Sequence, residues 1–187
     1  MLRPATLVDL PILRALIRDG AAAGTFDRHL ATDSPETTRL FTNLRQALTA
    51  GYFVEEDPRT GKLVTVAVPG YMYLAGDGGT SHRPAGFGFF KAAGDGYELW
   101  LSGIDPVQRG QGTPMLAELL KTAPGQKAYI VRISTAGPES QAMAQLLVSC
   151  GYAGARLTPQ TTWFLRNDTP EEVGEPLRPA RRPSAAG

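Results

Sequence analysis

The feature of this sequence that most constrains its fold lies near the middle of the chain, where an apolar strand leads through a glycine-containing turn into a helix. The strand is predicted over 97–104 and the helix over 113–123. Unpaired backbone N–H groups and the positive end of the helix dipole meet at such a helix start. Gly110 and Gly112 let the backbone approach another group closely. This glycine corner, the turn 105–112 with the helix start, is either a phosphate site or an ordinary connection that needs glycine for its own geometry.

Two familiar phosphate-binding loops are excluded. The turn carries no Gly-Lys-Ser or Gly-Lys-Thr sequence, so it is not the phosphate loop of a P-loop protein. No G-x-G-x-x-G sequence opens an early βαβ unit, which excludes a Rossmann dinucleotide site. A phosphate site in the glycine corner must therefore be of another kind.

The remaining elements are predicted from the spacing of apolar residues. Helices are expected over 10–21, 35–50, 113–123 and 139–150, and strands over 2–6, 52–56, 62–68, 85–91, 97–104, 127–134 and 161–167. Residues 69–84 are left open between an extended strand and a loop. This order has too few βαβ units for a doubly wound sheet and predicts a mixed α/β (α+β) fold.

Local signals define the ends of the first two helices. Asp9 is the expected N-cap of the first helix. Ser34 followed by Pro35 is the expected start of the second helix, and Gly51 is expected to end it. These four positions predict the start of the first helix and both ends of the second.

Composition and charge fit one globular domain of 187 residues with a net charge of +1, so no general attraction to nucleic acid or to a membrane surface is expected. We assign residues 1–167 to this domain and 168–187 to a proline-rich tail that would be disordered alone. No run approaches the roughly 20 apolar residues that span a bilayer. The single Cys150, interpreted as a buried apolar residue, is compatible with a reducing cytoplasm. We expect a cytoplasmic protein, leave a homodimer open and assign no metal ligand.

The glycine corner also resembles a known family. Residues 109–114, Arg-Gly-Gln-Gly-Thr-Pro, resemble the acetyl-CoA motif Q/R-x-x-G-x-G/A of the GNAT superfamily of acetyl-CoA-dependent N-acyltransferases. Residues 2–17 look like the family's opening strand and helix, and residues 140–152 resemble its later helix. The resemblance covers roughly residues 2–166, with the elements in the family's order.

The resemblance implies a GNAT fold, with a central, mostly antiparallel sheet of six to seven strands and four helices. Pantetheine would run between two parallel strands that splay apart, here 97–104 and 127–134, with a β-bulge at Gly103 opening the splay. The backbone N–H of Ile104 would bond the acetyl carbonyl and its developing oxyanion. The positions assigned to acetyl-CoA are Ile104, Arg109, Gly110, Gln111, Gly112, Thr113 and Ser134.

The sequence departs from the family pattern at two positions. Pro114 takes the final Gly/Ala position and removes one N–H, which a first helical turn tolerates. Leu147 stands where many members carry a tyrosine that protonates the CoA thiolate. Water or another hydroxyl, with Ser134 and Ser140 as candidates, would have to replace it, unless proton donation is unimportant.

The reaction needs a base that takes a proton from the substrate ammonium group. Glu98, on the strand before the glycine corner, is our candidate, and the alternative is an outward, solvated position on a half-exposed strand. Glu55 and Glu56 on a neighbouring strand are further candidates. His29 and His82 are interpreted as surface histidines.

The expected function is therefore N-acetylation of a primary amine by direct transfer from acetyl-CoA in a ternary complex. Family members build substrate walls from the loop between the first two helices, here 24–33, and from a late hairpin region, here 152–162. Phe26, Asp27 and His29 are the resulting substrate-side candidates. The amine, on a small molecule or a protein, is not identified. The alternative is a degenerate GNAT module that binds CoA, or nothing, as a regulatory or assembly domain.

Overall fold

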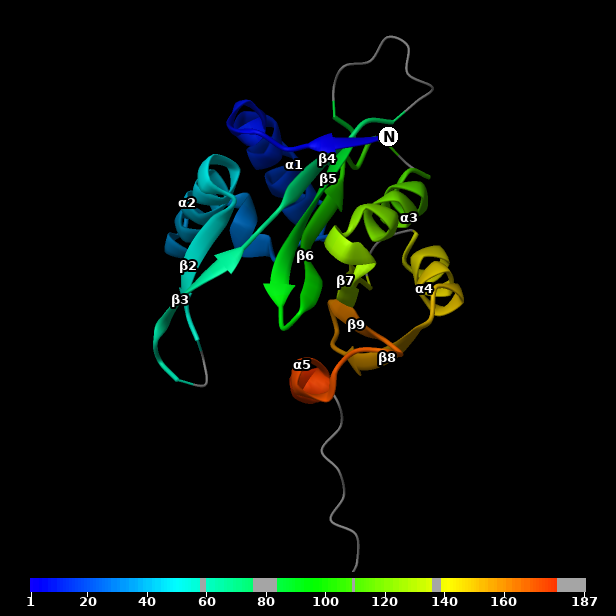
Figure 1. Cartoon of the computed structure of the whole chain (residues 1–187). Helices are drawn as coiled ribbons and strands as arrows, with labels where there is room; N and C mark the ends of the chain where they lie inside the picture. The colour runs from blue at the N-terminus through cyan, green and yellow to red at the C-terminus, as the bar shows by residue number, and fades with distance from the viewer. Residues whose placement is uncertain (58–59, 76–83, 109, 136–138, 178–187) are drawn as a thin grey trace, which may run out of the picture.

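The computed structural model describes residues 1–57, 60–75, 84–108, 110–135 and 139–177. The central strands are β1 (Leu2–Pro4), β4 (Gly70–Tyr73), β5 (Gly86–Ala93), β6 (Gly96–Ile104), β7 (Ala128–Ser134), β8 (Tyr152–Leu157) and β9 (Thr161–Arg166). The helices are α1 (Leu10–Ala22), α2 (Pro35–Ala50), α3 (Gly112–Thr122), α4 (Ser140–Ser149) and α5 (Glu171–Gly174). The strands form one sheet in the order β1-β4-β5-β6-β7-β9-β8 (Figure 1).

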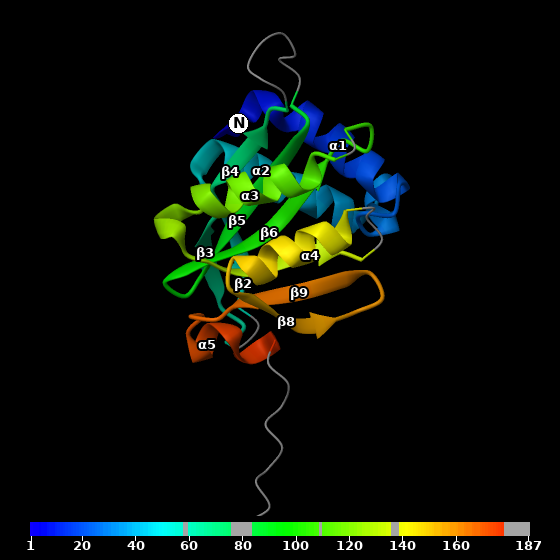
Figure 2. The same ribbon diagram turned by 90° about the vertical axis from the view of Figure 1, so that its right-hand side faces the viewer.

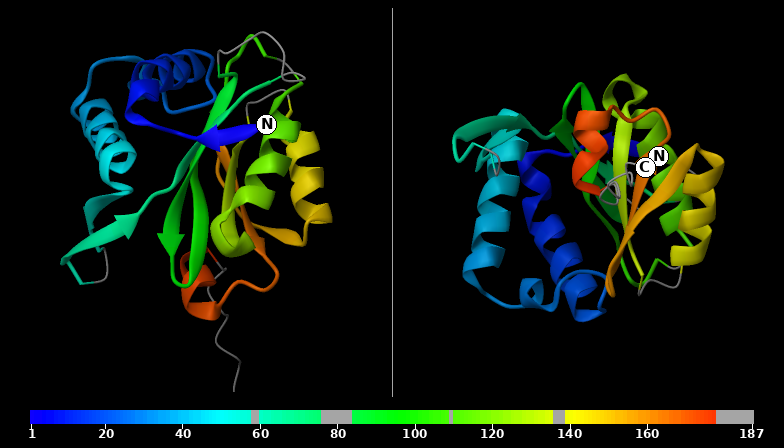
Figure 3. Two further views of the ribbon diagram at one scale, coloured as in Figure 1. Left: turned by 45° about the horizontal axis from the view of Figure 1, so that its top comes forward. Right: turned by 90° about the horizontal axis from the view of Figure 1, so that it is seen from below.

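Helices pack on both faces of this sheet. Figures 2 and 3 show α1 and α2 on one face and α3 and α4 on the other. Phe87 and Phe89 of β5 belong to the core under α1 and α2. Phe90 and Leu99 belong to the core under α3 and α4. Successive strand residues point to opposite faces, so neighbouring residues of β5 serve two separate cores.

The predicted fold class is confirmed. Among the described strand pairs of the sheet, β6 and β7 are parallel and the others are antiparallel. The expected ends of α2 are also observed, because the Thr37 N–H donates to Ser34 Oγ over 3.1 Å and Gly51 adopts a φ of 78°. The backbone signals at both ends of this helix therefore act as the sequence predicts.

Strands β2 (Tyr52–Glu56) and β3 (Leu63–Ala67) form a separate two-stranded sheet. This hairpin extends beside α2 and away from the central sheet (Figure 1). The strand that pairs with both β1 and β5 is β4, which lies in the stretch 69–84 that the sequence left open. Because β4 fills the place between β1 and β5, the hairpin of β2 and β3 is not part of the central sheet.

The chain after β9 packs on the domain. Thr169 is buried, and its hydroxyl donates to the Arg166 backbone oxygen over 2.7 Å. Val173 and Leu177 join a small core with Tyr129 of β7. Packing on the domain thus continues to Leu177, and the domain boundary after residue 167 stays a prediction. Residues 178–187 lie outside the described part of the chain.

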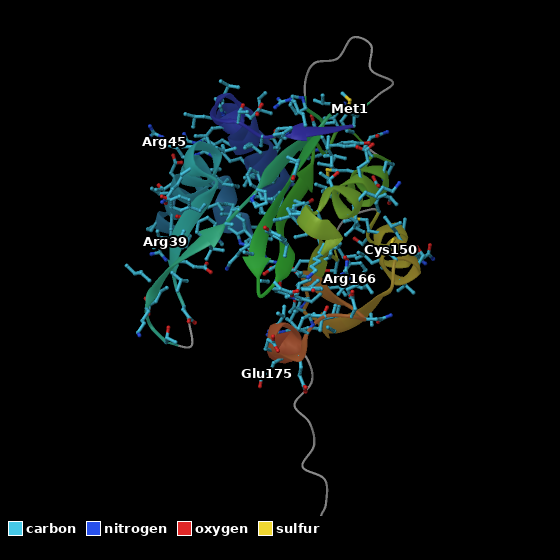
Figure 4. All side chains as sticks on the ribbon, viewed as in Figure 1. Met1, Arg39, Arg45, Cys150, Arg166 and Glu175 are labelled. Carbon is cyan, nitrogen blue, oxygen red and sulfur yellow. The ribbon has the colours of Figure 1, made fainter. Side chains whose placement is uncertain are left out.

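The interpretation of Cys150 as a buried residue is wrong. Cys150 is exposed at the C-cap of α4 (Figure 4). The helical spacing places it in line with Leu147, which is fully buried, but the helix ends at Ser149 and the chain turns through Gly151 at a φ of 83°. The apolar stripe therefore stops before its last member reaches the core.

Asp9 does not cap α1 with its side chain. Its buried carboxylate instead accepts hydrogen bonds from Nη2 and Nη1 of Arg3, at 2.6 and 2.8 Å. The Thr6 N–H also donates to it over 2.8 Å. The Arg3 hydrogen bond, supported by the Thr6 contacts, holds the pKa of the Asp9 carboxyl below its ordinary value against the opposing effect of burial. This cluster ties β1 to the entry of α1.

We expect Asp9→Asn to lower the free energy of unfolding at pH 7 by about 1.5–3 kcal/mol, the value of a charge-assisted hydrogen bond. The Asp9 carboxyl has a lower pKa in the folded protein than in the unfolded chain. Its contribution to stability is therefore fully present above the unfolded pKa, about pH 4, and is lost as the pH falls through the folded-state pKa. Denaturant unfolding at pH 7 and near pH 2 should therefore show the deficit shrinking in acid. Asp33→Asn is the control, since Asp33 also pairs with an arginine but its side chain is 88% exposed. Equal deficits at both pH values would contradict the assigned ion pair.

Candidate functional site

Strands β6 and β7 separate after a short stretch of parallel pairing. Three residues of β6 have a partner on β7, and the last such pair is Leu99 with Val131. Strand β6 nevertheless continues to Ile104 and β7 to Ser134. The divergence of the two strands that the family resemblance implied is therefore observed, with its open end toward the glycine corner.

The bulge on β6 lies at Trp100 and not at Gly103 as expected. Phe89 pairs with Leu101 and Phe90 with Leu99, so Trp100 is the extra residue. Gly103 has a different structural role, because a Cβ at this position would lie 2.6 Å from Cζ of Phe26. The absent side chain makes room for an aromatic ring that packs on the strand.

The pairing of β5 with β6 determines the direction of the Ile104 N–H. The Asp105 N–H donates to the Ala85 oxygen over 2.7 Å, and the next pair toward the sheet is Gly86 with Ile104. Hydrogen-bonded and non-hydrogen-bonded pairs alternate along an antiparallel ladder. The Ile104 N–H therefore points away from β5, toward the side on which β7 has diverged.

The glycine corner binds a carboxylate of the same chain. The Gly110 N–H donates to Glu139 Oε1 over 2.6 Å, and the Thr113 N–H donates to Glu139 Oε2 over 3.0 Å. Gly110 has a φ of 81°, a conformation that favours glycine. Two amides converge on one anionic group, so the corner has the geometry of an oxyanion site. Arg109, a predicted phosphate ligand, lies outside the described residues.

The other predicted corner residues are held by neighbouring elements. The Tyr73 hydroxyl donates to Gln111 Oε1 over 3.1 Å. A Cβ at Gly112 would lie 2.3 Å from Cε of Met143, so this glycine also permits α4 to approach α3. Pro114 is exposed in the first turn of α3, where its missing N–H breaks no bond within the helix.

Glu98 is half-buried beside a cation. Its side chain is 16% exposed, and Oε1 lies 3.1 Å from Nε of Arg132 on β7. Burial raises the pKa of the Glu98 carboxyl above its ordinary value, although the charges of Arg132 and Lys91 oppose the shift. The solvated, outward position that was the alternative for Glu98 is therefore not observed.

The two further acidic candidates differ in placement. Glu55 on β2 pairs with Lys91 of β5 over 2.7 Å and raises the pKa of Glu98 by like-charge repulsion. Glu56 is exposed, and its place on β2 is on the opposite face from Glu55 because successive strand residues alternate. Glu55 therefore belongs to the same charged cluster as Glu98, and Glu56 does not.

Of the substrate-side candidates, Phe26 lies beside the splayed strand. Its ring contacts the positions of Gly20 and Gly103 and stacks on Phe87 with a centroid separation of 6.3 Å. Asp27 and His29 are exposed in the connection between α1 and α2. The structure thus places Phe26 against the residue that precedes Ile104 and leaves the other two at the surface. His82 lies outside the described residues.

The candidate proton donors are engaged elsewhere. Leu147 is fully buried in the core under α3 and α4. The Ser140 hydroxyl donates to the Ser134 backbone oxygen over 2.6 Å, which links the start of α4 to the end of β7. Ser134 itself is half-buried where β7 ends. The Ser140 hydroxyl is therefore already bonded to the backbone, and proton donation by Ser134 or by water stays a prediction.

Two residues of the site were missed by the sequence analysis. Glu139 was expected only as the start of a helix, and Arg132 only as a polar residue within a strand. Both act across the fold: Glu139 binds Thr113, 26 positions earlier in the sequence, and Arg132 binds Trp100, 32 positions earlier. The sequence holds no local signal for such contacts.

No protein-family model matches the sequence, and no curated protein sequence matches it significantly. The structure resembles the ribosomal-protein-S18-alanine N-acetyltransferase from Escherichia coli, with a TM-score of 0.52 and 14% identity over 89% of this chain and 92% of that chain. It also resembles an acetyltransferase from Thermus thermophilus, with a TM-score of 0.51 and 18% identity over 89% and 95% of the two chains.

A third similar structure is the PaiA N-acetyltransferase from Thermoplasma acidophilum in complex with coenzyme A, with a TM-score of 0.50 and 13% identity over 89% of this chain and 98% of that chain. The fold of this chain is therefore that of the GNAT acetyltransferases. Separately, none of the helices in the described ranges is both long and apolar enough to cross a membrane. The cytoplasmic location and the homodimer stay predictions.

We expect Gly103→Ala to destabilise the protein by about 1–3 kcal/mol, because the added methyl group overpacks against the Phe26 ring. Gly154→Ala is the control, since nothing lies within 4 Å of a Cβ at that strand position. Adding Phe26→Ala should remove part of the cost of Gly103→Ala, because contacting residues couple. Thermal or denaturant unfolding of Gly103→Ala, Phe26→Ala, the double variant and Gly154→Ala measures both effects, and additive losses would contradict the assigned contact.

Proposed function

We propose that this protein is an N-acetyltransferase that transfers an acetyl group from acetyl-CoA directly to a primary amine. The observation that carries the proposal is the splay of β6 and β7 beside an anion-binding glycine corner. The fold of the GNAT acetyltransferases, three of them cited above, supports it. The corner and the splay lie on consecutive elements, so one extended ligand can reach both.

The corner fits the pyrophosphate of acetyl-CoA on the evidence of its own contacts. The Glu139 carboxylate shows that the N–H groups of Gly110 and Thr113 converge on an anionic oxygen pair. We assign the pyrophosphate to the backbone from Gly110 to Thr113, which includes Gln111 and Gly112, and we retain the predicted roles of Arg109 and Ser134. Glu139 must leave the amides when a phosphate takes them, because one N–H cannot serve both groups at full strength.

Acetyl-CoA would supply an activated acetyl thioester. Glu98 takes the proton from the substrate ammonium group through a chain of waters, because six strand residues, on the order of 20 Å, separate it from Ile104 on β6. Its raised pKa brings its basicity closer to neutral pH. The Ile104 N–H donates to the acetyl carbonyl oxygen as negative charge develops there. Water delivers the proton to the leaving thiolate, because Leu147 cannot donate one and Ser140 is bonded to a backbone oxygen.

Phe26 forms an apolar wall of the acceptor side, since its ring packs on Gly103 directly before Ile104. We keep Asp27 and His29 as outer contacts of the acceptor. The Escherichia coli neighbour acts, by its name, on an alanine of ribosomal protein S18. For this chain we propose a primary amine of a small molecule or a protein and no narrower class.

The proposal is tested with acetyl-CoA and a panel of primary amines, amino acids, aminoglycosides and N-terminal peptides, followed by the release of free thiol. Glu98→Gln should lower the rate with an active amine by about 10²–10⁴-fold at neutral pH if Glu98 is the base. The loss should shrink toward pH 9, where more of the amine is already neutral. Glu56→Gln is the control, because Glu56 is exposed on the outer face of the hairpin.

Three results would contradict parts of this proposal. CoA binding without thiol release for any amine would indicate a binding module instead of an enzyme. No CoA binding at all would remove the assignment of the glycine corner. A Glu98→Gln variant with the wild-type rate across pH 6–9 would leave the transferase in place and assign the base elsewhere.

We expect Glu139→Gln to bind CoA about two- to fivefold more tightly at low salt, because it loses a carboxylate charge that stabilises a helix N-terminus by about 0.3–1 kcal/mol. Calorimetric titration with CoA measures the change. Glu36→Gln is the matched control, since Glu36 lies in the first turn of α2. The gain should fade in high salt. Weaker binding in Glu139→Gln would show that Glu139 supports the ligand instead of competing with it.

A further inference from the structure

Arg132 lies where β6 and β7 diverge and has no role in the mechanism above. It directly follows Val131, the last β7 residue that pairs with β6. Its Nη2 donates to the backbone oxygen of Trp100, the bulged residue of β6. Its guanidinium carbon also lies 4.6 Å from the centroid of the Trp163 ring on β9. A single side chain therefore bridges the gap between the diverging strands.

The same guanidinium faces the candidate base. Arg132 Nε lies 3.1 Å from Glu98 Oε1, but the N–H is not aligned for a hydrogen bond to any described residue. The contact is thus an ion pair whose strength depends on charge and distance more than on direction. The Arg132 side chain is 31% exposed and that of Glu98 is 16% exposed, so water screens the pair only in part.

The charged groups that face Glu98 come from three other strands. Arg132 comes from β7, Lys91 from β5 and Glu55 from β2. Lys91 and Glu55 pair with each other over 2.7 Å and act on the Glu98 carboxyl in opposite directions. Arg132 is consequently the cation that acts on Glu98 without a competing carboxylate in contact among the described residues.

We propose that Arg132 is a positioning residue of the transferase: it holds the Glu98 carboxylate at the start of the splay and keeps it in its ionised, proton-accepting form. Through the Trp100 oxygen, the same side chain holds the bulged residue of β6, which directly follows the last residue paired with β7. This assignment rests on the proposed function, because a base is needed only if an amine is acylated. A merely structural Arg132 would hold the bulge without influencing the titration of Glu98.

The direct test is the titration of the Glu98 carboxyl by ¹³C NMR in protein labelled at glutamate, with Glu98→Gln identifying the signal. Arg132→Gln removes the cation, which disfavours the carboxylate, so the midpoint should rise by about 1–3 pH units. Arg132→Lys retains the charge and should stay near the wild-type midpoint. Arg156→Gln is the matched control, because Arg156 is exposed on β8 and is the register partner of Trp163.

The pH–rate profile with acetyl-CoA and an active amine gives the second readout. The acidic limb should move to higher pH in Arg132→Gln by the same interval as the NMR midpoint. Arg132→Lys should keep the limb and lose rate equally at all pH values, because lysine cannot reproduce the bond to Trp100 together with the stacking on Trp163. A limb that stays in place in Arg132→Gln while the rate falls would overturn the proposal and leave a structural role.

A third readout does not depend on the folding of an Arg132 variant. In the wild type, the ¹⁵N resonance of Arg132 Nε should titrate with the midpoint of Glu98, and Glu98→Gln should abolish this step. An unchanged Nε resonance would overturn the proposal. Failure of the proposed function has a different signature: no amine releases thiol, whereas the Arg132 Nε resonance still shifts as Glu98 ionises.

Discussion

The site depends on the loss of pairing between β6 and β7 after Leu99 and Val131. Backbone groups in a buried sheet need partners, and beyond this point the adjacent strand no longer supplies them. The chain satisfies one such group with a side chain, since Arg132 bonds the oxygen of the bulged Trp100. The Ile104 N–H faces the same opening, farther along β6. The divergence that shortens the β6–β7 pairing thus also leaves free the backbone donor that the proposed mechanism uses.

The glycine corner shows how an anion site is stabilised within the chain itself. Orphan N–H groups at a helix N-terminus need acceptors, and Glu139 at the N-cap position of α4 supplies two oxygens to Gly110 and Thr113. The same contact ties the start of α4 to the start of α3, together with the packing of Met143 at Gly112. The proposed phosphate would use the same amides as Glu139, so its binding would gain only the difference between the two interactions.

Local signals in the sequence predicted much of the fold. The positions that could not be predicted are those whose role depends on contacts between distant elements. Ser34 and Gly51 determine the ends of α2 from their own backbone chemistry, and the strand–corner–helix unit was visible in the pattern of glycines and apolar residues. Gly103 was expected to form the bulge because the family resemblance implied one that opens the splay. The structure instead explains this glycine by the ring of Phe26, which comes from another element. The role of Arg132 likewise depends on its contacts with β6 and β9, which no local sequence pattern indicates. Such positions require the assembled sheet.

The hairpin of β2 and β3 shows that an addition outside the sheet can still set the electrostatics of the site. Lys91 is the register partner of Glu98 on β5, and alone it would favour the carboxylate and lower its basicity. Glu55 from the hairpin pairs with Lys91 and opposes that effect. Arg132 then remains as the cation beside Glu98, but burial outweighs it and the pKa stays raised. The pKa of Glu98 thus depends on groups from four strands. Arg132 on β7 favours the ionised carboxyl, and burial of Glu98 on β6 raises its pKa. Glu55 on β2 opposes the lowering of that pKa by Lys91 on β5.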